Sequence, residues 1–329
     1  MVASNVISFA PVAAPLLQQW LLAQLGQAAL RVVAFDDLPE AERNAALADA
    51  EVALGDYTFR GAVDETLLSR MPKLKFLQQP SVGYEHIDLE ACRRRGVLVA
   101  NTPGVNAAAV AEHTILLALA LLKRLVVANE ATHAGRWSQR ELMWERGVFE
   151  LAGKTYGLVG CGAIGKEVVK RLRPFDVQLV YFDMQRLTPE QESELGIRFK
   201  PLDHLLRLAD VISLHVPLTD TTRNLIGRRE LGLMKFNAIL INVARGGCVD
   251  ECALAERLRA KKLGGAGLDV FSQEPIAADH PLRGLDNVIL TPHIAGATNE
   301  VRERVVRIAV ANMVQVLQGR PPQHVLNAP

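Results

Sequence analysis

Short apolar runs alternate with amphipathic stretches along the first third of the chain. Runs rich in Val, Leu and Ile, typical of buried strands, occur at residues 6–9, 30–34, 51–54, 75–78 and 97–100. Between them, apolar residues recur at helical spacing near residues 16–25, 39–48 and 63–70. Strands that alternate with helices predict βαβ units and a parallel sheet.

A second series of strands begins at residue 155. Its apolar runs lie at residues 156–159, 177–182, 211–214, 238–241, 267–270 and 288–290. The pattern predicts six parallel strands, which is the number expected of a complete dinucleotide-binding domain.

Two sheets in one chain require a boundary, and Thr102-Pro103-Gly104 interrupts the pattern. A long apolar helix follows at residues 107–122, and residues 298–317 predict an amphipathic helix that returns to the first domain. We therefore expect two flavodoxin/Rossmann-like, doubly wound parallel-sheet α/β domains with a cleft between them. Residues 1–103 plus 294–329 would form a discontinuous substrate-binding domain, and residues 104–293 would form a nucleotide-binding domain.

The charge balance and the cysteines narrow the function classes. The 37 basic and 36 acidic residues give a net charge of +1, which indicates neither nucleic acid nor a membrane surface as partner. The run Arg93-Arg94-Arg95 is predicted to be a solvated helix end. The four cysteines lack zinc-site spacing, so we expect no metal. Few cysteines, and an apolar N-terminus without a leading basic residue, favour a soluble protein of the reducing cytoplasm.

A glycine fingerprint follows the first strand of the second series. Gly160 permits a tight turn, Gly162 allows close approach of a pyrophosphate, and Gly165 allows the next helix to pack on the sheet. Asp183 ends the second strand, where a carboxylate binds the adenosine ribose and repels a 2′-phosphate, which predicts NAD as the cofactor. Arg186 could soften that preference, and the alternative is that Asp183 merely caps a turn.

Further blocks extend this fingerprint to a family. They occur at residues 82–88, 106–113, 215–218, 242–247, 268–275 and 291–296. In these blocks, and in their order, the chain resembles the D-isomer-specific 2-hydroxyacid dehydrogenases. The resemblance implies an NAD-dependent enzyme that interconverts a small D-2-hydroxy acid and its 2-keto acid, and a homodimer with the long apolar helix at the contact.

The resemblance also implies roles for individual residues. Arg245, Glu274 and His293 match the family's catalytic set, and the backbone of Val82 and Gly83 would bind the substrate carboxylate. Besides the glycines and Asp183, the expected cofactor contacts are Ala163, Ile164, Val216, Pro217, Val243, Ala244, Arg245, Asp269, His293 and Gly296.

The chemistry of keto-acid reduction independently suits the same three side chains. NADH supplies the hydride, and a histidine such as His293 can supply the proton. Glu274 would favour the imidazolium and orient the ring, and the planar fork of Arg245 can hold a carboxylate. Taken singly, each residue is more often a capping, packing or surface residue. Their positions after successive strands beside a glycine fingerprint favour catalysis.

Several related activities compete with this interpretation. Formate enzymes of the family carry Gln where this chain has Glu274, which counts against formate as the substrate. Dehydrogenation of 3-phosphoglycerate, oxidation of phosphite and a role as a dinucleotide-sensing corepressor stay open as alternatives. Asp56 would repel a substrate phosphate, and Arg60 falls late in the loop that could bind one. We expect a small unphosphorylated acid such as glyoxylate, hydroxypyruvate or pyruvate. The second choice is a larger apolar substrate beside Tyr57 and Phe59.

Overall fold

The computed structural model describes residues 4–26, 28–57 and 61–328, which divide into two compact units. The first unit contains the residues up to Val105 together with those from Asn299 onward, and the second contains Asn106–Thr298. The expected boundary at residue 293 falls too early, because Ala295 is buried in the core of the second unit. Phe59 and Arg60 lie outside the described residues.

The first unit has a parallel sheet whose order, within the described residues, is β2-β1-β3-β4-β5. This is the flavodoxin-like order. The strands are β1 (Ser4–Ser8), β2 (Leu30–Ala34), β3 (Val52–Leu54), β4 (Phe76–Gln78) and β5 (Leu98–Ala100). The helices are α1 (Ala14–Leu25), α2 (Glu40–Asp49), α3 (Glu65–Ser69), α4 (Leu89–Arg94) and α13 (Asn299–Leu317).

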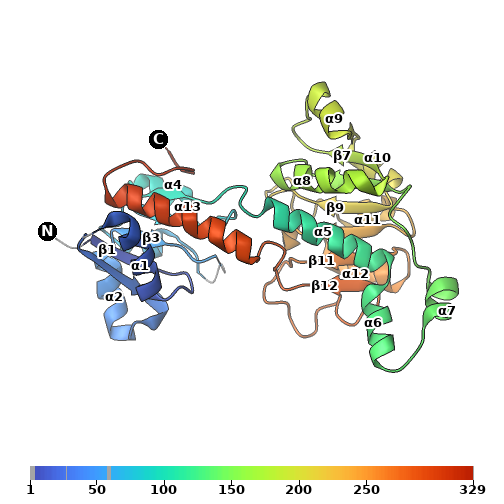
Figure 1. Cartoon of the computed structure of the whole chain (residues 1–329), viewed down its shortest axis with the longest axis horizontal. Coiled ribbons are helices and arrows are strands. Elements are labelled where there is room, and N and C mark those ends of the chain that lie inside the picture. The colour runs from blue at the N-terminus through green and yellow to red at the C-terminus, as the bar shows by residue number, and fades with distance from the viewer. Residues whose placement is uncertain (1–3, 27, 58–60, 329) are drawn as a thin grey trace. The chain divides into compact units, whose positions relative to one another are not determined.

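The returning helix α13 closes one face of that sheet. Its residues Val310 and Met313 are buried against Leu17 and Leu21 of α1 and Phe76 of β4, and α1 and α13 lie side by side in Figure 1. Buried Asn312 donates to Gln78 Oε1 at 2.8 Å. Burial of these apolar side chains explains why a helix from the far end of the chain belongs to this unit.

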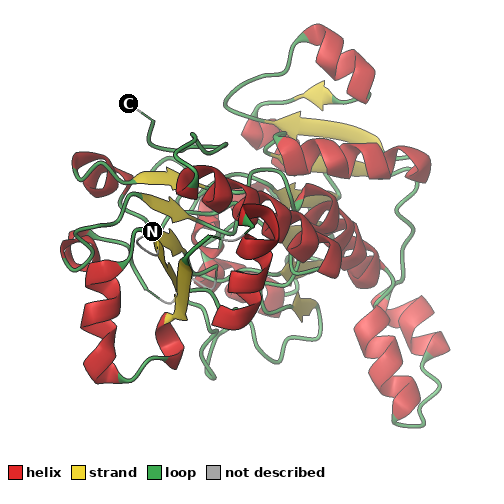
Figure 2. Cartoon of the chain, turned by 60° about the vertical axis from the view of Figure 1, so that its left-hand side comes forward, coloured by secondary structure: helices red, strands yellow, loops and turns green. Residues whose placement is uncertain are grey.

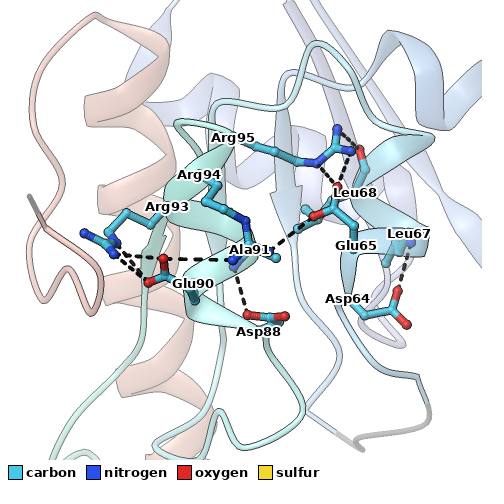
Figure 3. A network of polar contacts seen from close by, with 10 residues as sticks. All are labelled: Asp64, Glu65, Leu67, Leu68, Asp88, Glu90, Ala91, Arg93, Arg94 and Arg95. Atoms are coloured by element: carbon cyan, nitrogen blue, oxygen red, sulfur yellow. Dashed lines mark hydrogen bonds and ion pairs between the residues drawn. The ribbon is translucent and has the colours of Figure 1, made fainter.

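The arginine run is a solvated helix end, as predicted. Arg93 pairs with Glu90 within the helix α4, and Arg95 donates to Glu65 of α3 at 2.9 Å (Figure 3). Arg94 lies between the same two carboxylates, 3.7 Å from Glu65 and 3.9 Å from Glu90. Arg94 and Arg95 thus connect α4 to α3 on the surface of the first unit, whereas Arg93 pairs within its own helix.

The second unit has a parallel sheet of seven strands among the residues described, in the order β12-β11-β10-β9-β6-β7-β8. The strands are β6 (Thr155–Val159), β7 (Gln178–Phe182), β8 (Arg198–Phe199), β9 (Val211–Leu214), β10 (Ile239–Asn242), β11 (Gly265–Leu268) and β12 (Val288–Leu290). Counted from β6, this is the dinucleotide-binding order 3-2-1-4-5-6 with one strand added. The expected count of six was wrong because the two-residue strand β8 carries too short a pattern to recognise.

Helices cover both faces of this sheet. The α-helices of this unit are α5 (Ala107–Leu122), α6 (Leu125–His133), α7 (Gln139–Glu141), α8 (Ala163–Leu172), α9 (Pro189–Leu195), α10 (Leu202–Leu208), α11 (Arg228–Leu233) and α12 (Glu251–Arg259). The helices α5 and α8 share one apolar core, and α10, α11 and α12 share the other (Figure 1). Every helix in the described parts of the chain is too short or too polar to span a bilayer.

The α6–α7 arm, residues 125–146, stands out from the second unit (Figures 1 and 2). It exposes Trp137 by 82%, Trp144 by 75% and Met143 by 58%. Large apolar side chains gathered on an exposed segment are typical of a contact surface.

Candidate active site

The glycine turn joins β6 to α8 at the point where the strand order reverses. Gly160 has φ +98°, and a Cβ there would lie 2.6 Å from the carbonyl oxygen of His215. A Cβ on Gly165 would lie 2.5 Å from the carbonyl oxygen of Gly160, so both positions require glycine for the fold itself. Gly162, in contrast, faces nothing within 4 Å. It leaves room for a ligand at the N-terminus of α8, whose first residues are Ala163 and Ile164.

Asp183 directly follows β7 and braces the same turn. One carboxylate oxygen accepts the Cys161 N–H at 2.7 Å, and the other accepts the Gln185 N–H at 3.1 Å. Asp183 therefore does cap this turn, as the alternative interpretation of the sequence expected. Binding of a ribose by the same half-buried carboxylate stays a prediction.

Arg245 extends from a tight turn after β10. Buried Asn242 holds this turn, since its Oδ1 accepts the Ala244 N–H at 3.1 Å and its Nδ2 donates to the Arg245 carbonyl at 3.0 Å. Gly246 packs so closely that an added Cβ would lie 1.8 Å from the carbonyl carbon of Phe271. The turn that carries Arg245 is thereby pressed onto the loop that carries Glu274.

Glu274 and His293 form a hydrogen-bonded pair. His293 Nδ1 lies 2.8 Å from Glu274 Oε2, and the side chains are 37% and 35% exposed. Burial raises the pKa of the Glu274 carboxyl, but hydrogen bonds from His293 and the Phe271 N–H, helped by nearby Arg245, hold that pKa below its usual value. The carboxylate engages one ring nitrogen and fixes the ring, so Nε2 can face a substrate.

The backbone at His293 is in a strained conformation. Its φ of +54° lies in the left-handed region, which is uncommon for a residue with a side chain. Buried Asp269 stabilises this conformation, since its carboxylate accepts Thr291 Oγ1 at 2.6 Å and the Ile294 and Ala295 N–H groups at 2.9 and 2.8 Å. His113 Nε2 lies 3.1 Å from the same hydroxyl. Asp269 and His113 thus act as scaffold around His293.

A second buried carboxylate, Glu251, holds the Glu274 loop. Its oxygens accept the Ser272 N–H and hydroxyl, both at 2.7 Å, and contact His280 Nε2 at 3.0 Å. Glu251 is 7% exposed and lies in the first turn of α12. The role of Glu251 was not predicted from the sequence, because Glu251, Ser272 and His280 belong to no motif with a fixed spacing. The Asp250-Glu251 pair at a helix start was the available signal.

The remaining candidates occupy loops in both units. Val216 and Pro217 come after His215, the first residue beyond β9, and the Pro217 carbonyl accepts a hydrogen bond from Thr222 Oγ1 at 2.6 Å. In the first unit, the carbonyls of Val82 and Gly83 accept Asn101 Nδ2 and Ser81 Oγ, both at 2.8 Å. These bonds orient the two peptide groups of that loop.

Comparison with known proteins identifies the family. Residues 115–295 match the family described as "D-isomer specific 2-hydroxyacid dehydrogenase, NAD binding domain". The chain is 43% identical to a glyoxylate reductase of Thermofilum pendens over 265 residues, covering 80% of this chain and 78% of that protein. The chain belongs to the D-2-hydroxyacid dehydrogenases. It is an NAD-dependent enzyme of that family, as the sequence predicted.

Two further relatives of this dehydrogenase bear on its fold and substrate. A D-lactate dehydrogenase from Aquifex aeolicus, solved with NAD and lactic acid, is 32% identical with a TM-score of 0.84, covering 99% of this chain and 100% of that one. A D-3-phosphoglycerate dehydrogenase of Archaeoglobus fulgidus is 38% identical over 81% of this chain but only 50% of its own length. The doubly wound parallel-sheet fold of both units is confirmed.

Proposed function

We propose that this dehydrogenase reduces a small, unphosphorylated 2-keto acid to the D-2-hydroxy acid with NADH, and catalyses the reverse reaction. The Glu274–His293 pair carries this proposal, because it places an oriented imidazole at the carboxyl edge of the sheet that also bears the glycine turn. The relatives named glyoxylate reductase favour glyoxylate among the candidates, with hydroxypyruvate and pyruvate next.

Each catalytic side chain has one task. NADH, when bound, supplies the hydride to the substrate carbon. His293 donates the proton to the developing alkoxide, and Glu274 stabilises its imidazolium form and orients the ring. Arg245 binds the substrate carboxylate and polarises the carbonyl group, together with the N–H groups of Val82 and Gly83.

The cofactor would lie along the carboxyl edge of β6, β7, β9 and β10. The N–H groups at Gly162, Ala163 and Ile164 would bind the pyrophosphate at the start of α8, and Asp183 the adenosine ribose. The nicotinamide side would be lined by Val216, Pro217, Val243, Ala244, Asp269 and Gly296.

Unphosphorylated substrates are favoured by the loop after β3. Asp56 is 8% exposed, and a carboxylate in such a place would oppose a second anionic group. Tyr57 is 46% exposed and could contact an apolar substrate side chain, which keeps larger keto acids as the second choice.

We further propose a homodimer that works in the cytoplasm. The α6–α7 arm, with Trp137, Met143 and Trp144, would form the contact together with α5, whose Leu116 is 55% exposed. All four cysteines are free thiols, which suits a reducing compartment.

A panel of substrates tests the reaction. The measurement is kcat/KM for NADH-dependent reduction of glyoxylate, hydroxypyruvate, pyruvate, phenylpyruvate and 3-phosphohydroxypyruvate. A clear preference for the phosphorylated compound would refute the substrate class, and no turnover with any compound would favour a dinucleotide-sensing role.

Replacement of the proton donor tests the mechanism. His293→Ala should lower kcat about 10²- to 10⁴-fold while NADH binding persists. His204→Ala, at an exposed position of α10, is the matched control and should leave kcat unchanged. A normal rate in His293→Ala would remove this histidine from the mechanism.

A further inference from the structure

Arg186 lies three residues beyond Asp183, in the connection from β7 to α9, and its guanidinium is engaged by one carboxylate. Nε donates to Glu192 Oε1 at 2.8 Å and Nη2 donates to Glu192 Oε2 at 3.3 Å. The guanidinium carbon also lies 5.1 Å from the ring centroid of Phe199, within cation–π range. Phe199 belongs to β8, the strand that the sequence pattern did not reveal.

Glu192 is itself fixed in place from the protein side. Its side chain is 15% exposed, and its Oε1 also accepts the hydroxyl of Tyr181 at 2.9 Å. That hydroxyl accepts the Leu187 N–H at 2.9 Å, which ties the connection after Arg186 to β7. A capping box between Thr188 and Gln191 sets the start of α9, so Glu192 has a defined position in its first turn.

The Arg186–Glu192 ion pair bears on the choice between NADH and NADPH. The adenosine 2′-phosphate of NADPH needs a cation at the end of the second strand of the sheet, where an arginine accommodates it. Arg186 has the right charge and lies in the right connection. Its Nε and Nη2 groups, however, donate to Glu192, and its guanidinium lies over the ring of Phe199. A phosphate would have to compete with both partners.

We propose that Glu192 is a specificity-determining residue, which holds Arg186 against Phe199 and so withholds this guanidinium from the 2′-phosphate of NADPH. Discrimination then rests on two carboxylates with different tasks. Asp183 repels the phosphate directly, and Glu192 sequesters the cation that would attract it. The inference rests on the proposed place of the adenosine ribose at Asp183.

The test is a set of variants whose Kd values for NADH and NADPH are measured by direct binding in the absence of keto acid, and which are then assayed with both dinucleotides in the substrate-saturated reduction. Glu192→Gln keeps the shape of the side chain and its contact with Tyr181 but removes the charge. We expect the ratio of kcat/KM for NADPH to that for NADH to rise about two- to fivefold, the size expected for loss of a partly exposed ion pair. Glu194→Gln removes the same charge from an exposed position of α9 and should leave the ratio unchanged.

Arg186→Ala decides whether the released guanidinium is the cause. When combined with Glu192→Gln, it should abolish the rise in the ratio of kcat/KM for NADPH to that for NADH. In an Asp183→Ser background, where the repelling charge is gone, Glu192→Gln should increase NADPH use further. A Glu192→Gln ratio equal to that of Glu194→Gln in both backgrounds would overturn the inference, as would a gain that persists without Arg186.

Failure of the proposed ribose site gives a different result. If Asp183→Ser alone changes neither the KM for NADH nor the use of NADPH, the ribose does not lie at Asp183 and the premise falls. Keto-acid reduction by the wild-type protein tests the proposed reaction separately from both.

Discussion

Carboxylates at the amino ends of the strands of the seven-stranded sheet (the amino edge) have different hydrogen-bond partners from those at the carboxyl ends (the carboxyl edge). At the amino edge, Asp210 precedes β9, accepts the Thr155 N–H at 2.9 Å and pairs with Lys235 at 2.7 Å. At the carboxyl edge, the donors to Asp183 are backbone N–H groups, and those to Asp269 include a hydroxyl. The donor to Glu274 Oε2 is an imidazole. The amino edge pairs its carboxylate with a lysine, whereas the carboxyl edge holds its carboxylates with backbone, hydroxyl and imidazole donors, at the place where we propose that ligands bind.

The difference implies that substitutions at the two edges have different costs. A charge paired at the amino edge contributes to stability alone, so its loss should leave the chemistry intact. At the carboxyl edge, the hydrogen bonds of Asp269 and Glu274 determine where His293, the proposed proton donor, lies. Small errors in the position of catalytic groups are expensive in rate.

The largest effect is expected at Gly246. In Gly246→Ala, the new Cβ would overlap the Phe271 backbone at 1.8 Å, so the catalytic loop must move. The free energy of unfolding should fall by about 4 kcal/mol or more, with a large loss of kcat. Gly247→Ala is the matched control, since its Cβ would meet the ends of side chains, the Leu218 methyl groups at 3.2 Å and Arg223 Nη1 at 3.8 Å. Thermal unfolding and steady-state rates compare the two, and equal behaviour would show that the close approach is not critical.

Gly162 should separate binding from folding. Gly162→Ala adds a methyl group where nothing lies within 4 Å, so stability should be retained. The KM for NADH should rise about tenfold or more if the pyrophosphate approaches this backbone. Gly232→Ala, in α11, also enters open space and is the control. An unchanged KM in Gly162→Ala would place the pyrophosphate elsewhere.

Glu274→Gln should shift the pH dependence of keto-acid reduction. The pKa of Glu274 is held below its usual value, so the carboxylate is ionised throughout the assay range and stabilises the imidazolium of His293. Glutamine removes this negative charge, and the pH at which the rate falls to half should move down. The measurement is kcat/KM against pH. A profile that is unmoved or shifted upward would contradict the role given to Glu274.

The smallest effect is expected for Asp210→Asn. Burial raises the pKa of this carboxyl, but Lys235 and the Thr155 N–H more than offset this, so the pKa lies below the ordinary 3.8. Its stabilisation is present above that value and is lost as the pH falls through the lowered pKa. Asp210→Asn should cost about 0.5–1 kcal/mol in urea unfolding near neutral pH and little at about pH 3, with kcat unchanged. A loss of kcat comparable to that in Glu274→Gln would abolish the distinction between the edges.

The sequence predicted those elements and site residues that a regular apolar pattern or a motif with a short, fixed spacing reveals. The helix at residues 107–122 and the glycine turn were placed correctly, and Glu274 was expected beside His293. The strand β11 was expected two residues late because Gly265 and Gly267 have weak strand propensity. Their missing side chains let Leu117 and Leu121 of α5 pack against the sheet, a contact invisible along the chain.

Residues that act through long-range contacts could not be predicted. Glu251 meets Ser272 and His280 through folding alone, and Glu192 meets Arg186 across a helix start that pattern analysis did not locate. Neither pairing follows a fixed spacing, so the supporting residues of the site emerged only from the structure.

The return of α13 to the first sheet has a consequence for synthesis on the ribosome. The second unit is contiguous and has all its strands once Thr298 has emerged. The first unit is made earlier, yet Val310, Met313 and Asn312 reach it last, and Asn327 completes it by accepting the Val99 N–H and donating to the Val97 carbonyl at 2.8 Å. The nascent chain therefore completes its two units in the reverse of their order of translation. Until α13 is made, the apolar surface around Leu17, Leu21 and Phe76 stays exposed.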